Sequence, residues 1–445
     1  MTSVYRYRSS QYLIFASRIA FAITLFLIPF RWRVELLARP IPPLYADYTD
    51  FLLFASDISM LAMLVFWACS MLIDLRRLRT GSIFILILLV GLTLSGWISV
   101  LGSEDPIISQ YHAVRFTGYL LFFLYIVNEI KSAVWVIVPV GMQILFQSAF
   151  AIAQSISQSS LGLRKLGELT LDPESTGVSV VIVNGFRFLR GYGLSDHPNI
   201  LGGCIAFGLI LILAVILYGK RNERMLASIV FLVSILALAL TFSRSAWLSF
   251  FVAASFMVGF EAFYQRWDSL KWVAVLSALS ILVVAPFIQK NISVFTERVN
   301  SGNISQDDQI QERAYLIEAG SLIFVEHSAI GIGLGASPYA MKKYYPEFRL
   351  DYQPPHYTLL TVAMETGVIG GAFYFLLITM PVLTFILRWR EYSSRPFVMG
   401  AFALLLAVTV VGFFDYYTWL YAPGRLWQWL AWGIWSTTIS THGAA

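Results

Sequence analysis

Residues 199–263 decide the fold of this chain, because they contain three long apolar runs separated only by short polar breaks. The first run, residues 199–218, is NILGGCIAFGLILILAVILY, twenty residues without a charge. The break 219–225, GKRNERM, separates it from the run 226–242, and the run 246–263 follows directly. About 20 apolar residues in a helix cross the ~30 Å hydrocarbon core of a bilayer. This stretch therefore predicts three successive transmembrane helices.

The composition of the whole chain agrees with a membrane protein. Of its 445 residues, 58% are hydrophobic and 13% are charged, whereas about a quarter of the residues in soluble domains are charged. This balance excludes a soluble enzyme. The 31 Lys and Arg residues are scattered through the predicted loops, which argues against a nucleic-acid-binding surface. Cys69 and Cys204 both lie in apolar runs, so we expect no disulfide framework.

The same pattern recurs along the chain and predicts an all-α polytopic membrane protein with about 12 transmembrane helices. The predicted spans are 11–30, 51–73, 82–101, 111–127, 133–154, 199–218, 226–242, 246–263, 272–288, 357–387, 397–417 and 426–441. They divide the chain into N-terminal helices (1–154), a first long loop (155–198), central helices (199–288), a second long loop (289–356) and C-terminal helices (357–445).

Basic residues in alternate short loops predict the orientation of the chain in the membrane. The basic loops contain Arg76, Arg77 and Arg79; Lys131; Lys220, Arg221 and Arg224; Arg266 and Lys271; and Arg388, Arg390 and Arg395. Short basic loops face the cytoplasm. Both termini are then cytoplasmic, and the two long loops are extracytoplasmic. Because connections of this length usually carry function, we expect the chemistry on the outer face.

Each long loop contains a predicted element. In the first, residues 178–183 and 186–189 flank Asn184-Gly185, a turn typical of a β-hairpin. In the second, an amphipathic helix is predicted to open near Asp307 and to lie on the membrane surface or on the bundle. Its predicted apolar stripe is Ile310, Ala314, Ile317 and Phe324.

The predicted span 357–387 is longer than a membrane requires. A helix of thirty residues is about 45 Å long, against a hydrocarbon core of ~30 Å. We expect it to project outward or to bend, with the bend or a close helix contact at Gly367, Gly370 and Gly371.

Cationic and imidazole side chains collect at the predicted outer ends of the spans. They are Arg190, His197, Arg244, Arg313, His356 and Arg425. A single arginine at this level usually anchors the protein to lipid headgroups. A set of arginines with a histidine instead favours a phosphate-binding reactive site. The planar guanidinium offers paired donors to phosphate oxygens, and the imidazole can accept a proton near neutral pH.

Four blocks of sequence hold most of these residues. They are RGYGLSDHPNILG (190–202), TFSRSAW (241–247), ER (312–313) leading to GIGLG (331–335), and PPHYTLL (354–360) leading to ETG (365–367). In this order and spacing, the blocks resemble the O-antigen ligase and O-antigen polymerase family of bacterial cell-surface glycan transferases. The family commonly has Asn directly after the histidine, where this chain has Tyr357.

The resemblance implies a glycosyltransferase of the bacterial inner membrane that works without a metal or other cofactor. It would move a glycan from a polyprenyl diphosphate carrier, such as undecaprenyl diphosphate, to a hydroxyl of a glycan, lipid or protein acceptor on the outer face. This chemistry belongs to the biosynthesis of lipopolysaccharide and other polysaccharides.

The resemblance also implies roles for the residues in the four blocks. It puts Arg244 and Arg313 on the diphosphate and His356 at the acceptor, with Arg190 as a helper. Because a histidine pKa near 6.5 suits proton removal from the acceptor hydroxyl, His356 is the candidate general base. His197 is either a turn residue beside Pro198 or a further substrate-binding candidate. From their predicted depth in the membrane, Asp57 and Asp415 are candidates to orient the histidine or to bind sugar hydroxyls.

Three alternatives stay open. A repeat-unit polymerase of the same family differs from a ligase only in its acceptor, and the paired arginines with His356 slightly favour the ligase. The span count and the charges inside spans are also compatible with a twelve-span secondary transporter. Those charges are Arg18, Asp57, Arg115, Glu261 and Asp415. A metal-dependent glycosyltransferase would have to use Asp47 and Asp50, which share an outer loop.

Overall fold

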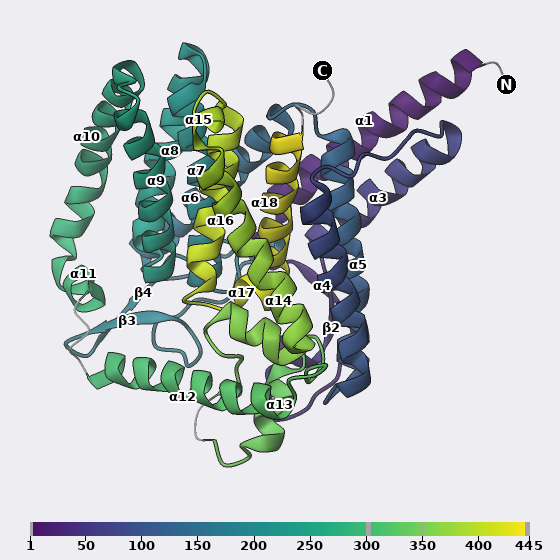
Figure 1. Cartoon of the computed structure of the whole chain (residues 1–445). Helices are drawn as coiled ribbons and strands as arrows, with labels where there is room; N and C mark the ends of the chain where they lie inside the picture. Colours follow the sequence, from purple (N-terminus) through teal and green to yellow (C-terminus); the bar gives the residue numbers. More distant parts are fainter. Residues whose placement is uncertain (1–2, 300–303, 349–350, 441–445) are drawn as a thin grey trace.

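The computed structural model describes residues 3–299, 304–348 and 351–440, and these residues form an all-α polytopic membrane protein. Figure 1 shows long helices side by side in a bundle, with α12 and α13 across its lower end. The first helices are α1 (Ser3–Leu27), α2 (Ala46–Thr49), α3 (Ala55–Ile73), α4 (Ile83–Ser99), α5 (Pro106–Glu129) and α6 (Val134–Ser157). The central helices are α7 (Pro198–Tyr218), α8 (Arg221–Leu240), α9 (Arg244–Phe263), α10 (Trp267–Lys290), α11 (Ile292–Val299), α12 (Ile304–Glu326) and α13 (Ser337–Tyr344). The last helices are α14 (Thr358–Leu387), α15 (Trp389–Tyr392), α16 (Pro396–Gly412), α17 (Tyr417–Leu420) and α18 (Ala422–Ser440).

Each predicted span corresponds to one long helix of the bundle. Among the described residues, the helices long and apolar enough to cross a membrane are α1, α3, α4, α6, α7, α8, α9, α10 and α14. The three other predicted spans are α5, α16 and α18, which run alongside them (Figure 1). The apolar helix α16 has 17 residues, and α5 and α18 carry buried polar side chains such as His112 and Arg425. The fold class predicted from the sequence is confirmed.

Two predicted span boundaries are wrong. Residues Phe51–Phe54 form the strand β2, which pairs antiparallel with β1 (Arg33–Leu37), so the helix α3 begins only at Ala55. A short apolar run cannot be assigned to strand or helix by its periodicity alone. At the other end of the chain, α16 ends at Gly412. Asp415 therefore lies in the connection between α16 and α17, not inside a membrane span.

The first long loop contains the predicted hairpin. Strands β3 (Val180–Val183) and β4 (Phe186–Leu189) pair antiparallel. Both turn residues have positive φ angles, 49° at Asn184 and 85° at Gly185, as a two-residue hairpin turn requires. The loop also includes the 3-10 turn η2 (Arg164–Leu166), and a second such turn, η1 (Val100–Gly102), follows α4.

The second long loop is more helical than predicted, and the predicted apolar stripe of its amphipathic helix is wrong at Ala314 and Ile317, whereas Phe324 packs partly buried as expected. The helix α12 buries Leu316, Ala319 and Ile323, while Ala314 and Ile317 are exposed. The side chain of Ile310 lies outside the described residues. Because apolar residues occur all around α12, its sequence period does not single out one face. The short helices α11 and α13 were not predicted.

The helix α14 is interrupted at Gly367, as the glycines of this segment predicted. Gly367 has φ 72° and ψ −179°, a conformation essentially limited to glycine. The carbonyl oxygens of Met364 and Glu365 accept hydrogen bonds from the backbone of Ile332 (3.0 Å) and Gly333 (3.1 Å) instead of from the next helical turn. The break therefore ties the segment that follows α12 to the helix that follows His356.

We expect Gly367→Ala to destabilise the protein. A Cβ at this position would lie 2.6 Å from the carbonyl oxygen of Ala329, and the backbone conformation itself is strained for alanine. The free energy of unfolding should fall by about 2 kcal/mol or more. Gly259 is a matched control, because a Cβ there meets nothing within 4 Å and alanine favours a helix. The measurement is thermal unfolding of both variants in detergent; equal transition temperatures would contradict the role of the break.

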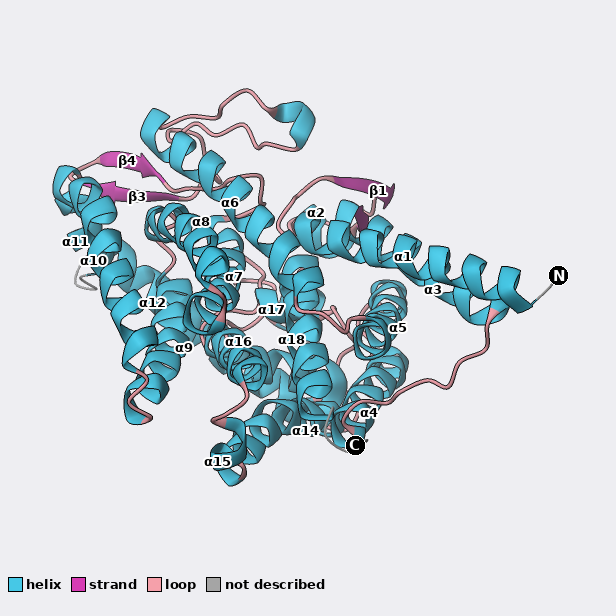
Figure 2. Cartoon of the chain, turned by 90° about the horizontal axis from the view of Figure 1, so that it is seen from above, coloured by secondary structure: helices cyan, strands magenta, loops and turns pink. Residues whose placement is uncertain are grey.

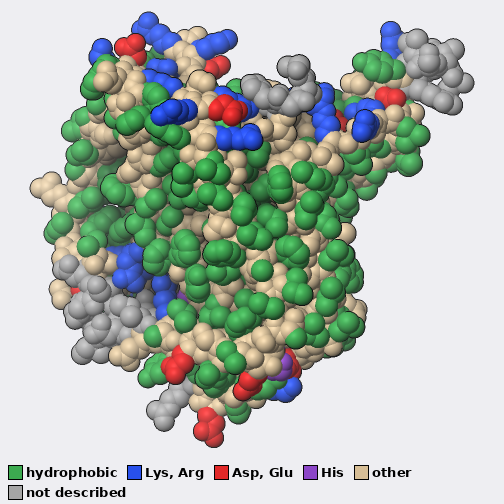
Figure 3. Space-filling view, in the orientation of Figure 1, with side chains coloured by type: hydrophobic (Ala, Val, Ile, Leu, Met, Phe, Trp, Pro, Cys, Tyr) green, Lys and Arg blue, Asp and Glu red, His purple; other side chains and the backbone are tan. Residues whose placement is uncertain are grey.

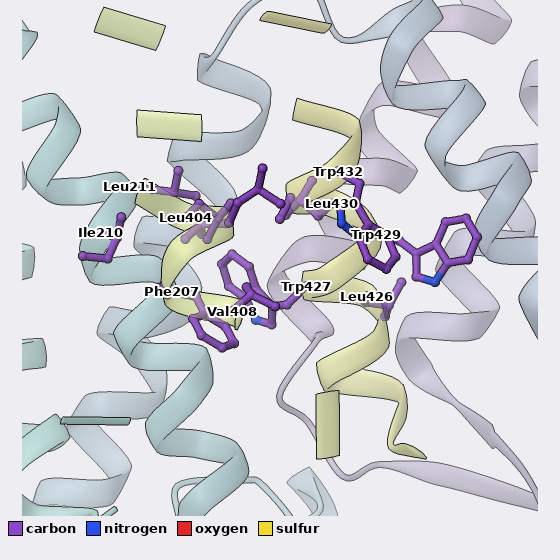
Figure 4. Packing of buried hydrophobic residues seen from close by; sticks show 14 of the residues in the cluster. Phe207, Ile210, Leu211, Leu404, Val408, Leu426, Trp427, Trp429, Leu430 and Trp432 are labelled. Atoms are coloured by element: carbon purple, nitrogen blue, oxygen red, sulfur yellow. The ribbon is translucent and has the colours of Figure 1, made fainter. Parts of the chain in front are cut away.

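The core of the bundle lies where α7, α16 and α18 meet (Figure 4). Trp427 and Trp429 of α18 are at most 1% exposed, and the ring of Phe207 packs edge-on against Trp427 at 5.6 Å. Lipid tails are as apolar as leucine, so membrane helices associate through close packing rather than through exclusion of water. This rigid centre supports the connection between α16 and α17, in which Asp415 lies.

The helices α1 and α3 project away from the rest of the bundle. Figure 2, a view from above, shows the pair on one side and α9, α10 and α11 on the opposite side, with α17 between them. The two projecting helices contact each other, and Thr24 donates a hydrogen bond to Ser59 at 3.0 Å. The molecule therefore has two different lipid-facing flanks.

Candidate functional site

Two glycines at the start of α7 allow close contact with the turn between α8 and α9 and with α17. A Cβ on Gly202 would lie 3.0 Å from Ser243 and Thr241, in the turn between α8 and α9. A Cβ on Gly203 would lie 1.8 Å from the hydroxyl of Tyr417 in α17. No larger residue fits at either position without displacing its neighbour. The candidate site is built around this close contact.

Two arginines from other parts of the chain bind neighbouring backbone carbonyl groups of the turn between α8 and α9. Arg190 Nε donates to the carbonyl oxygen of Thr241 at 2.7 Å, and Arg298 Nε donates to the next carbonyl oxygen, that of Phe242, at 2.8 Å. Phe242 itself has a positive φ of 49°. Arg244 begins α9 two residues further on. The turn thus gathers three guanidinium groups from different parts of the chain.

A fourth arginine, Arg313 of α12, completes this group. Burial and the charges of Arg244 and Arg313 lower the pKa of Arg298 to about 10. Such a shift requires the like charges to lie close together. We call Arg190, Arg244, Arg298 and Arg313 the arginine cluster. In Figure 3 a group of Lys or Arg side chains, with a His beside it, lies at the lower end of α9, below the apolar belt.

His356 lies beside the arginine cluster and faces an acid. Its Nδ1 lies 3.8 Å from Asp415 Oδ1 and is buried without a hydrogen-bond partner among the described residues. Burial lowers the pKa of His356 to about 4, an effect that Asp415 opposes and Arg313 reinforces. The imidazole is therefore neutral near pH 7. Because Nδ1 is turned toward Asp415, Nε2 is the nitrogen that can reach a ligand.

Asn199 connects the acid to the arginine cluster. Its side-chain amide donates to Asp415 Oδ2 at 3.3 Å, while its carbonyl oxygen accepts from Arg190 Nη2 at 2.5 Å. Arg190 is also held by the hydroxyl of Ser179, next to β3, at 2.7 Å. This chain of contacts fixes Asp415 and Arg190 relative to each other from the first turn of α7.

His197 caps the helix that carries Asn199. Its Nδ1 accepts a hydrogen bond from the backbone N–H of Asn199 at 3.1 Å, which satisfies one of the unpaired donors at the start of α7. Burial, together with Arg190, Arg298 and His356, lowers the pKa of His197 to about 3. The residue is thus a neutral helix cap within the site.

His356 also contacts an aromatic side chain. The rings of His356 and Tyr416 pack edge-on with centroids 4.9 Å apart. The Tyr416 hydroxyl contacts the hydroxyl of Tyr48 at 2.8 Å and donates to Gln353 at 3.1 Å. Contacts with Tyr416 and Asp415 therefore position the imidazole.

Two residues expected near this site lie elsewhere. Asp57 is buried against Arg115, with contacts of 2.8 and 2.9 Å, and also accepts from the backbone of Phe54. It does not face His356. Arg425 lies inside the bundle, where it contacts His112 at 2.9 Å and stacks over Phe116. Position along the chain predicts the level of a residue in the membrane, but it does not define the direction of its side chain.

The other charges within the predicted spans form structural pairs. Arg18 lies 3.7 Å from Glu129, and Glu261 lies 2.8 Å from Arg266. These pairs are separate from the arginine cluster and from each other, as buried charges in membranes usually are when they stabilise helix packing. They do not line one midplane site of the kind a transporter uses.

The two outer-loop acids considered as metal ligands are also engaged. Asp47 accepts from Arg33 at 2.6 Å, and Asp50 accepts from the backbone of Arg39 at 2.8 Å. Within the described part of the chain, no group of three or more His, Cys, Asp or Glu side chains is arranged to hold a metal ion.

Sequence reasoning missed Arg298 and Asn199. Arg298 is on the short helix α11, and its position in the outer loop 289–356 was its only signal. Asn199 belongs to the block RGYGLSDHPNILG, in which only Arg190 and His197 had been singled out. A polar residue at the start of a predicted span is usually a cap, so its bridging contacts could not be predicted.

Comparison with known protein families agrees with three of the four sequence blocks, because the block 190–202 lies outside the matched segment. Residues 229–375, one third of the chain, match the family model described as O-antigen ligase. This segment includes Arg244, Arg298, Arg313 and His356, but not Arg190 or Asp415. A search of curated proteins found no match.

Proposed function

Because residues 229–375 match the family model described as O-antigen ligase, we propose that the chain is a membrane glycan transferase of this family and transfers a glycan from a polyprenyl diphosphate carrier to an acceptor hydroxyl. The observation that carries this proposal is the convergence of the arginine cluster with His356 and Asp415 at one end of the bundle. The arginines bind the diphosphate, and His356 is the general base.

The arginine cluster suits a diphosphate leaving group. When the glycosidic bond breaks, negative charge develops on the diphosphate oxygens. Guanidinium groups fixed by backbone carbonyl oxygens stabilise this charge without reorganising during the reaction. Their mutual repulsion, expressed in the lowered pKa of Arg298, is relieved when an anion binds. The free site is thus prepared for a polyanionic ligand.

His356 and Asp415 suit activation of an acceptor hydroxyl. The neutral imidazole takes the hydroxyl proton at Nε2 as the oxygen attacks the sugar carbon. The resulting imidazolium lies 3.8 Å from the Asp415 carboxylate, which stabilises the new positive charge. The hydroxyl proton ends on the histidine, and the bonding electrons of the broken glycosidic bond leave with the diphosphate.

The charge distribution supports an extracytoplasmic site. Lys and Arg side chains gather at the upper end of the molecule in Figure 3, beyond the apolar belt and opposite the arginine cluster. Both described chain ends also lie at this upper end (Figure 1). Under the rule that short basic loops face the cytoplasm, both termini are cytoplasmic and the site opens outside.

The pH dependence of transfer tests His356 as the base. The neutral imidazole is the active form, so transfer is expected to be complete above its pKa and to fall as the pH drops through about 4. The measurement is kcat/KM for the donor against pH, since this ratio reports the free enzyme. Bound diphosphate offsets the charge of Arg313, so the acid limb of kcat should lie at higher pH. A kcat/KM that does not fall as the pH drops through about 4 would contradict the assignment.

Reconstitution distinguishes a ligase from a polymerase. Purified protein in liposomes receives a carrier-linked repeat unit, with or without a separate acceptor. We propose the ligase, which gives one product size and only when the acceptor is present. A ladder of products without a second acceptor identifies a polymerase. No transfer under either condition, by protein that is folded in detergent, would overturn the proposed function.

A further inference from the structure

Asp415 faces His356 from a connection, so other residues must hold its carboxylate in place. It lies between α16 and α17 and is 5% exposed. Its carbonyl oxygen accepts a hydrogen bond from the hydroxyl of Thr358 at 2.8 Å. Of the carboxylate oxygens, Oδ1 accepts from the backbone N–H of Tyr416 at 2.9 Å, and Oδ2 accepts from the side-chain amide of Asn199 at 3.3 Å. The acid is therefore held at three points, two of them by side chains of other helices.

Thr358 ties the acid to the segment that carries the histidine. It is the first residue of α14, two positions after His356, and it is 1% exposed. A hydroxyl has a single proton to donate. Because Thr358 gives this proton to Asp415, the hydroxyl of Thr418, at 3.1 Å, is the donor in their contact. One hydrogen bond and two residues of backbone thus set the distance between the acid and the imidazole.

Asn199 holds the same acid from the side of the arginine cluster. Its side-chain N–H binds Asp415 Oδ2, and its side-chain carbonyl oxygen accepts from Arg190. With both carboxylate oxygens engaged, Asp415 Oδ1 lies 3.8 Å from His356 Nδ1. A neutral imidazole carries its proton on only one of its two nitrogens. The carboxylate favours the proton on the nitrogen that faces it, Nδ1, which leaves Nε2 free to accept a proton.

We propose that Thr358 and Asn199 are positioning residues, which fix Asp415 so that its carboxylate holds His356 in the Nδ1–H tautomer. This inference rests on the proposed function and specifies what prepares its general base. Both residues act through Asp415 and not on the substrate. If the acid turned away, the imidazole could carry its proton on Nε2. That nitrogen could then no longer take the proton of the acceptor hydroxyl.

The first test is Thr358→Val, with Thr418→Val as the matched control. Valine has nearly the shape of threonine but lacks the hydroxyl. Thr358→Val loses the hydrogen bond to the carbonyl oxygen of Asp415, whereas Thr418→Val loses a neighbouring buried hydroxyl and leaves that bond intact. Because a displacement of about 1 Å can cost about 10²-fold in rate, we expect kcat to fall by about 10–10²-fold in Thr358→Val. The KM for the donor should not change, Thr418→Val should keep the wild-type kcat, and Thr358→Ser should recover most of the lost rate.

A nitrogen NMR experiment tests the positioning role without measuring transfer. Protein with isotopically labelled histidine is observed in detergent at neutral pH, and the His356 signals are assigned by their absence from His356→Ala. Protonated and unprotonated ring nitrogens have different chemical shifts, so the spectrum reports the tautomer. We expect Nδ1–H in the wild type and in Thr418→Val, and Nε2–H or a mixture of both tautomers in Thr358→Val. A purely structural role would not change the tautomer of a folded variant, so Nδ1–H alone in folded Thr358→Val would overturn the inference.

Asn199→Leu is a second variant, which carries the test even if Thr358→Val does not fold. Leucine is similar in size to asparagine, but it neither donates to Asp415 Oδ2 nor accepts from Arg190. The tautomer of His356 should shift as in Thr358→Val. Because Arg190 also loses a partner, the KM for the donor should rise by about tenfold, the effect of one hydrogen bond to a charged group. The wild-type tautomer in folded Asn199→Leu would overturn the role of Asn199.

The outcomes separate this inference from the proposed function. If the wild type transfers glycan and Thr358→Val has the same kcat as Thr418→Val, the positioning role is overturned while the proposed function stands. If Thr358→Val loses the Nδ1–H tautomer of the wild type but the wild type transfers no glycan, the positioning of the imidazole is supported and the proposed function fails. An Nε2–H tautomer in the wild type would overturn the inference directly.

Discussion

Replacing His356 by alanine is expected to reduce glycan transfer by about 10²–10⁴-fold, the usual contribution of a general base. The imidazole lies beside Asp415 and Tyr416, and its proton-accepting Nε2 is lost in the variant. The measurement is kcat in liposomes with saturating donor and acceptor. Donor binding should be retained, because the arginine cluster is intact.

His327 provides the matched control for this substitution. It lies after α12, where its ring packs against Tyr344 at 5.4 Å, and it has no contact with the site. We expect His327→Ala to transfer glycan at the wild-type rate. Near-normal turnover by folded His356→Ala would remove the base assignment, while the diphosphate role of the arginines would still stand.

Alanine substitution of Arg244, Arg298 or Arg313 is expected to lower kcat by about 10²–10³-fold, as does removal of one donor that stabilises transition-state charge. Arg164, on the turn η2 of the other long loop, is the control, because it is exposed and lies outside the cluster. Arg164→Ala should leave kcat unchanged. The effect on KM for the donor should be smaller than the effect on kcat, since charge on the diphosphate grows as the bond breaks.

Lysine variants examine how the cluster works. A lysine keeps the charge but lacks the planar pair of donors, so Arg244→Lys and Arg313→Lys should recover only part of the lost rate. Full recovery by lysine would show that the cluster acts through net charge alone. An unchanged kcat in all three alanine variants would contradict a phosphate-binding role.

The long helices could be predicted from the sequence because membrane spans are defined by length and hydropathy, which are local properties. The break in α14 and the Asn184-Gly185 turn could also be predicted, because each depends on residues close together in the sequence. Elements that depend on a distant partner could not be predicted. The strand β2 exists because β1 pairs with it, and the buried face of α12 is chosen by the surface on which it packs.

The residues of the candidate site divide in the same way. The arginines and histidine at the outer ends of spans could be found because their depth follows from position in the chain, and the sequence blocks associated them with a family. Their geometry could not be found. Asp57 and Asp415 had equal standing as orienting acids, yet Asp57 is paired with Arg115 while Asp415 faces His356. Only the three-dimensional arrangement distinguishes them.

The interrupted helix α14 also constrains how this chain can change over evolutionary time. A side chain at Gly331 would meet the carbonyl oxygen of Glu365 at 2.4 Å, and a side chain at Gly367 would meet the carbonyl oxygen of Ala329 at 2.6 Å. Each added side chain would thus clash with the backbone of the other glycine's segment. A substitution elsewhere changes side chains only, so it cannot remove a clash with the backbone. A substitution of either glycine cannot be compensated by one further mutation. Both glycines should therefore be retained in proteins descended from this sequence, even where the substrates of those proteins have diverged.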